Sequence, residues 1–139
     1  MNNYQIAESF SLLAKLMDIH DENSFKAKSY AAAAFTIEKL PIQLSETPTE
    51  KLFGIKGIGE SAGKKVIELL TTGALQALEE MIAKTPPGVL EMLHIKGIGP
   101  KKIATIWKEI LLLMVPDRAM LRGPILEFSR GLVPLKILV

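Results

Sequence analysis

The chain has 139 residues, of which 48% are hydrophobic and 23% charged, the balance of one globular domain or two very small ones. The absence of cysteine excludes disulfides, thiolate zinc sites and cysteine catalysis, and the net charge of +2 does not by itself indicate nucleic-acid binding. No signal peptide is visible, and no apolar stretch reaches the roughly 20 residues that a membrane span needs, so we expect a cytoplasmic protein without a membrane partner.

Helical spacing of apolar residues predicts an all-α fold. The first two helices are expected near residues 3–18 and 25–40, the second capped by Asn23 or Ser24 and closed by Pro41. A polar connector over 41–49 precedes a short helix over 49–53. Further helices are expected over 60–70, 75–82, 89–93 and 100–110, and Trp107 is expected in the core. No segment shows sustained alternation, so no sheet is expected.

Residues 111–139 form a tail of atypical composition. Residues 1–110 contain 13 lysines and no arginine, whereas the tail has Arg118, Arg122 and Arg130 with only Lys136. This change has two interpretations: a segment from another reading frame or an insertion, or a C-terminal helix that packs on the core.

An internal repeat lies in the basic part of the chain. The pentapeptide Ile-Lys-Gly-Ile-Gly occurs at residues 55–59 and again at 95–99, each time between a short predicted helix and a longer one. Residues 54–108 hold eight lysines against five glutamates, whereas residues 1–53 hold five lysines against seven acidic residues. A solenoid needs about three repeats, so two copies indicate a duplicated supersecondary unit inside one compact helical domain.

The repeat has the chemistry of a phosphate site. Glycines let a ligand approach the main chain, and the helix that follows points its free N–H groups and positive dipole end the same way. Ile58 and Ile98 are expected to turn inward and pin the hairpins to the core. Contacts to phosphates carry no base information, so sequence-independent DNA binding is expected. The candidate DNA-binding residues are Lys56, Gly57, Gly59 and Lys64 in the first unit, and Lys96, Gly97, Gly99, Lys101 and Lys102 in the second.

The segments Gly57-Ile58-Gly59 and Gly97-Ile98-Gly99-Pro100-Lys101 resemble two helix-hairpin-helix motifs in a compact helical domain. Together with Phe25-Lys26 through Tyr30, they resemble the N-terminal region of family X DNA polymerases, including the bacterial members. The resemblance covers roughly residues 3–110. It implies a lyase-like N-terminal domain over 1–84 that holds the first hairpin, and a fingers-like second hairpin unit over 85–110. It also implies DNA repair as the context.

In that family the lyase domain removes a 5′-deoxyribose phosphate through a Schiff-base lysine on the helix after the first hairpin. The resemblance places this nucleophile on Lys65, a 5′-phosphate-binding lysine on Lys26 and an aromatic site residue on Tyr30. Partial burial and the neighbouring charge of Lys64 both favour the neutral amine that attacks an aldehyde. The alternative is a solvated helix lysine that only screens phosphate.

Several departures from the family pattern bear on activity. Phe25 stands where the family has a histidine, Ser61 where it has a further lysine, and Gly63 where the motif prefers alanine. Family X polymerases also need paired aspartates in a palm that hold two metal ions, and Asp117 is the only aspartate after residue 110. We therefore expect no polymerase activity, and the chain reads as the N-terminal portion of such an enzyme.

Three functions stay open at this point. The first is a non-catalytic clamp for gapped or nicked DNA, associated with the nucleoid; the second is a lyase with Lys65 as nucleophile; the third is a helical protein-interaction module. His20 and His94, the only histidines, do not indicate a side-chain metal site, and no small-molecule cofactor is expected. The resemblance implies a monovalent cation at the hairpin carbonyls when DNA is bound.

Overall fold

The computed structural model describes residues 1–114, and within them the chain is all-α, as predicted, with no strand. No helix in this part of the chain is long and apolar enough to cross a membrane. Of the tail predicted over 111–139, residues 111–114 are described and residues 115–139 lie outside the described part of the chain. In chain order the elements are α1 (Asn3–Ile19), α2 (Ser24–Lys39), the 3-10 helix η1 (Leu44–Glu46), α3 (Thr49–Leu52), α4 (Glu60–Thr72), α5 (Gln76–Ala83), α6 (Pro87–Met92) and α7 (Pro100–Met114).

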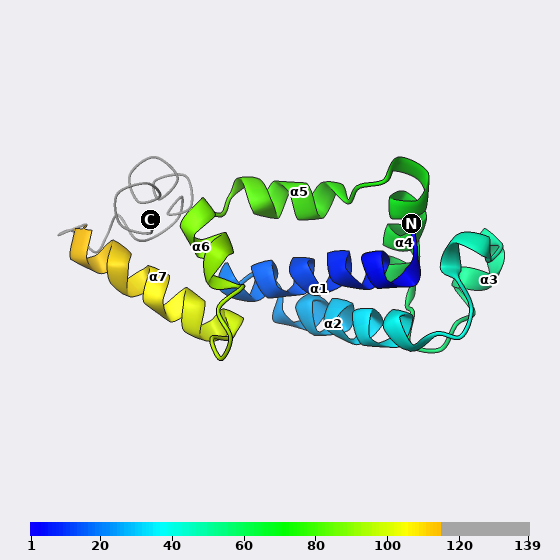
Figure 1. Ribbon diagram of the computed structural model, residues 1–139, viewed down its shortest axis with the longest axis horizontal. Helices are drawn as coiled ribbons and strands as arrows, with labels where there is room; N and C mark the ends of the chain where they lie inside the picture. Colours follow the sequence, from blue (N-terminus) through cyan, green and yellow to red (C-terminus); the bar gives the residue numbers. More distant parts are fainter. Residues whose placement is uncertain (115–139) are drawn as a thin grey trace.

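The α1–α2 pair forms the centre of the molecule (Figure 1). Asn23 caps α2 by accepting a hydrogen bond from the Lys26 amide at 3.1 Å, which confirms the first of the two predicted caps. Between the helices, the Phe10 and Tyr30 rings meet edge to face with centroids 5.9 Å apart. Both rings are buried, so they fix α2 on α1 through apolar contact.

The segment after α2 departs from the prediction of a polar connector. It contains η1, whose Leu44 is fully buried. The buried Asn3 side chain accepts a hydrogen bond from the Leu44 amide at 2.8 Å and donates one to the Ile42 carbonyl at 2.6 Å. These bonds join positions about 40 residues apart in the chain. Local sequence patterns therefore contain no signal for this helix.

α5 and α7 both pack on α1, so residues 85–110 share one hydrophobic core with residues 1–84 (Figure 1). Ile103, Trp107 and Leu111 are buried and lie four residues apart on one face of α7. Trp107 is thus a core residue, as predicted. The prediction that this helix ends near residue 110 is wrong, because burial of Leu111 continues the apolar stripe and α7 extends to Met114.

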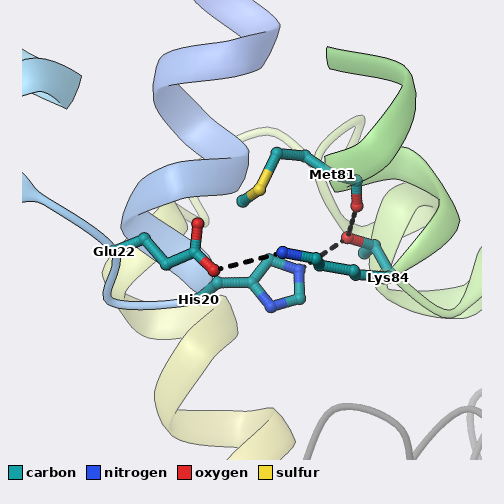
Figure 2. A network of polar contacts seen from close by, with 5 residues as sticks. His20, Glu22, Met81 and Lys84 are labelled. Atoms are coloured by element: carbon teal, nitrogen blue, oxygen red, sulfur yellow. Dashed lines mark hydrogen bonds and ion pairs between the residues drawn. The ribbon is translucent and has the colours of Figure 1, made fainter. Parts of the chain in front are cut away.

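His20, the residue directly after α1, lies beside the C-terminal end of α5 (Figure 2) and against the middle of α7. Its Nε2 lies 2.7 Å from the Thr85 hydroxyl, which itself donates to the Met81 carbonyl at 2.7 Å. The hydroxyl proton is engaged there, so Nε2–H is the donor to Thr85. The His20 ring also packs edge to face against the Trp107 ring, with the ring centroids 5.2 Å apart. Burial lowers the pKa of His20 to about 4, and the histidine is therefore a neutral structural group near pH 7.

An ion pair lies beside this histidine (Figure 2). Lys84 Nζ is 3.5 Å from Glu22 Oε1, and both side chains are more than a third exposed. Solvent-exposed pairs of this kind contribute less than about 1 kcal/mol. The packing of α5 and α7 on α1 therefore depends on buried contacts rather than on this pair.

Candidate nucleic-acid interface

The two copies of the pentapeptide fold into the same turn. The first connects α3 to α4 and the second connects α6 to α7, toward opposite ends of the α1–α2 pair (Figure 1). In each copy the second isoleucine amide donates to the first isoleucine carbonyl, at 3.1 Å in the first and 3.4 Å in the second. Gly57 and Gly97 have φ values of +94° and +92°, which disfavour any residue with a side chain. The two copies of the pentapeptide therefore adopt the same backbone geometry.

Each turn opens directly onto the N-terminus of a longer helix. The first main-chain bond of α4 runs from the Gly63 amide to the Gly59 carbonyl, and that of α7 from Ile103 to Gly99. The amides of residues 60–62 and 101–102 precede these bonds, so they have no acceptor within their own helix. Amides of this kind, together with the positive end of the helix dipole, suit a phosphate oxygen.

The hairpin glycines differ in how closely the protein surrounds them. Within the described residues 1–114, a Cβ added at Gly59, Gly97 or Gly99 would meet no atom within 4 Å, so this part of the protein leaves the main chain there open to a ligand. A Cβ at Gly57 would lie 2.7 Å from the Thr36 hydroxyl oxygen. The first hairpin is thus packed against α2, whereas the second is not held in this way.

The inward-facing isoleucines show the same difference. Ile58 is buried, as predicted, whereas Ile98 is only partly buried against the core.

A contact with Phe53 explains Gly63, which stands where the motif prefers alanine. A Cβ there would lie 2.8 Å from the Phe53 ring, so the ring occupies the space that alanine would need.

The five predicted hairpin lysines are all exposed at the surface: Lys56, Lys64, Lys96, Lys101 and Lys102. Lys64 pairs with Glu60 at 3.1 Å, and the other four form no ion pair among residues 1–114. The first-unit and second-unit lysines are carried by different helix pairs at the two ends of the molecule (Figure 1). The structure therefore presents two separate basic hairpins rather than one cluster.

A groove of about 460 Å³ lies between the start of α2 and the first hairpin. Gly57 and Gly59 line it together with Lys26 and Tyr30, so the structure brings these four predicted residues together. The Tyr30 hydroxyl lies 3.0 Å from Ser61 Oγ. The remaining lining residues are Asn23, Phe25, Ser29, Ala32, Glu60, Ser61 and Ala62, and the Phe25 side chain is 80% exposed.

Lys65 lines a second pocket of about 200 Å³, and Lys26 and Tyr30 line both this pocket and the groove. Its Nζ lies 5.6 Å from the centroid of the Tyr30 ring, and its side chain is partly buried. The three residues that the resemblance assigns to a lyase site therefore line one pocket.

Sequence reasoning missed the charged groups that share this pocket. Glu22, Glu80 and Lys84 also line it, and they come from the α1–α2 turn and from the end of α5. No motif marks these residues, because their approach to Lys65 depends on how α5 packs on α1. Within residues 1–114, no group of three or more histidine, aspartate or glutamate side chains is placed to hold a metal ion.

Comparison with known proteins agrees with this geometry. A family model described as a helix-hairpin-helix domain matches residues 1–75. The DNA polymerase/3′-5′ exonuclease PolX of Bacillus subtilis is 28% identical over 110 residues, which are 79% of this chain and 19% of that protein. The chain thus spans about a fifth of the length of this curated relative. Because the family model covers more than half of its residues, the chain belongs to the helix-hairpin-helix domain family.

Proposed function

We propose that this chain binds DNA without reading its base sequence, through contacts from both hairpins to the sugar-phosphate backbone. The family match and the similarity to PolX support DNA binding in general. The proposal of sequence-independent phosphate binding rests on the repeated turn. In both copies the turn leads directly into the N-terminus of a helix, and exposed lysines lie beside it. Main-chain amides and lysines bind phosphates of any sequence, so base identity does not enter.

The proposed DNA is gapped or nicked. A strand break exposes a terminal phosphate, which can enter the groove lined by Lys26, Gly57 and Gly59. A continuous duplex presents only backbone phosphodiesters to the same surface. The groove therefore favours an interrupted strand, while the second hairpin can hold intact backbone.

Binding is expected to weaken steeply with salt and to be equal for unrelated sequences. Each phosphate that is neutralised adds about −0.9 to the slope of log affinity against log salt. The double substitution Lys101→Gln/Lys102→Gln should reduce the slope by about 2, because it removes two hairpin charges. Fluorescence anisotropy with labelled gapped duplexes of two sequences measures both effects.

The matched control is Lys28→Gln/Lys39→Gln, which removes the same charge from exposed positions of α2 on the side of Phe35. This control should leave the slope nearly unchanged. Affinity that does not respond to salt would contradict DNA binding and favour a protein-interaction module.

The second candidate function is a 5′-deoxyribose-phosphate lyase, and the shared pocket of Lys26, Tyr30 and Lys65 favours it. The Lys65 amine would attack the aldehyde carbon of the ring-opened sugar and form an imine with loss of water. Glu22 and Glu80 line the same pocket and can accept the proton that the ammonium must first release.

If the lyase operates, borohydride should trap a covalent adduct with a gapped duplex that carries a 5′-deoxyribose phosphate. The adduct is expected with the wild type and with Lys64→Ala, the matched lysine control on the same helix. It should be lost in Lys65→Ala. An adduct that persists in Lys65→Ala would instead assign another amine of the pocket, and Lys26 and Lys84 are the alternatives. Salt-sensitive binding with no wild-type adduct would leave a non-catalytic clamp.

A further inference from the structure

The two hairpins carry opposite charge immediately after their identical pentapeptides. Glu60-Ser61-Ala62 follows the first copy and Pro100-Lys101-Lys102 follows the second. One glutamate gives the first helical turn a formal charge of −1, and two lysines give the second turn +2. The same backbone site is therefore presented in two different electrostatic settings.

Glu60 is placed where it opposes a bound phosphate. It is the first residue of α4 and lines the groove beside Gly57 and Gly59. Its carboxylate lies 3.1 Å from Lys64 Nζ, with the two side chains 78% and 69% exposed. The carboxylate thus holds the lysine that would neutralise phosphate and adds a negative charge at the same helix end.

In the free protein this arrangement stabilises α4. A carboxylate in the first turn interacts favourably with the helix dipole, and a Glu–Lys pair four residues apart supports the helix. α7 has no acidic residue in its first turn, and within residues 1–114 neither Lys101 nor Lys102 forms an ion pair. The second hairpin therefore offers phosphate two lysines that pair with no carboxylate of residues 1–114.

We propose that Glu60 is a negative determinant of phosphate binding at the first hairpin, and that the second hairpin is the primary backbone anchor. This inference rests on the proposed DNA binding. The first hairpin engages a phosphate only when Lys64 leaves Glu60, and it does so against the charge of Glu60. The second hairpin requires no such exchange.

The test measures affinity for a gapped duplex at low salt. Glu60→Gln is expected to bind about fivefold more tightly, because a like charge about 4 Å from a phosphate is removed in water. Its Tm in the absence of DNA should fall by about 2 °C, because α4 loses both the interaction of the carboxylate with the helix dipole and the ion pair with Lys64. Glu79→Gln, at an exposed position of α5, makes the same change of net charge and should alter affinity much less.

A second comparison ranks the hairpins directly. Lys101→Gln/Lys102→Gln should weaken binding more than Lys56→Gln/Lys64→Gln, although each removes two charges. Equal losses, or an affinity of Glu60→Gln no higher than that of Glu79→Gln, would overturn the inference while leaving salt-sensitive DNA binding intact. A wild type that binds no DNA at any salt would overturn both the inference and the proposed function.

Discussion

Replacing Trp107 with alanine is expected to lower the free energy of unfolding by about 4 kcal/mol. Trp107 is buried, and its ring packs on His20 at the end of α1. Truncation would leave a cavity between α7 and α1, which the surrounding helices can fill only in part. Urea unfolding followed by circular dichroism measures the loss.

Trp107→Phe is the control for this prediction. It keeps an aromatic ring against His20 and is expected to cost about 1 kcal/mol. Because α7 begins at the second hairpin, Trp107→Ala should also weaken DNA binding under conditions in which the protein remains folded. A loss of stability below about 1 kcal/mol for the alanine variant would show that other contacts hold α7 in place.

The two hairpin glycines should respond unequally to the same substitution. Gly57→Ala is expected to destabilise the protein by about 3 kcal/mol, because strain at positive φ adds to a steric clash with Thr36. Gly97→Ala has nearly the same φ but an open surrounding, and it should cost about 1.5 kcal/mol. Thermal or urea unfolding of the two variants measures the difference.

A double-mutant cycle with Thr36→Ala separates the two contributions to Gly57→Ala. Removing the Thr36 hydroxyl and methyl groups relieves the two closest contacts of the added Cβ. Gly57→Ala should therefore cost about 1.5 kcal/mol less in the Thr36→Ala background. Equal costs in both backgrounds would mean that strain alone, and not the contact with α2, accounts for the sensitivity of the first hairpin.

Much of the fold was predictable from local pattern. The apolar spacing of α1, α2, α4 and α7 predicts helices whose starts agree with the structure within one residue. The repeat predicts both hairpins, because the pentapeptide contains the glycine that the turn needs at positive φ. Each of these features depends on residues within one or two helical turns of each other, and such local interactions can be recognised from the linear sequence.

The candidate site was predictable only in part. The resemblance places Lys26, Tyr30 and Lys65, and the structure brings them to one pocket. The charged neighbours Glu22 and Glu80 were not foreseen, since they reach the pocket from a turn and from α5. The order of charged residues along a chain does not show which carboxylate lies near which lysine in the folded protein.

The sequence by itself therefore determined the α-helices apart from the end of α7, the two turns and the lysines beside them, because these follow from local conformational preference and side-chain chemistry. The tertiary structure alone decided the rest. Asn3 holds η1 in place, Thr36 packs against the first hairpin, and Leu111 extends α7 by burial. Each of these depends on contact between residues that are distant in the chain, and such contacts form only when the elements pack together.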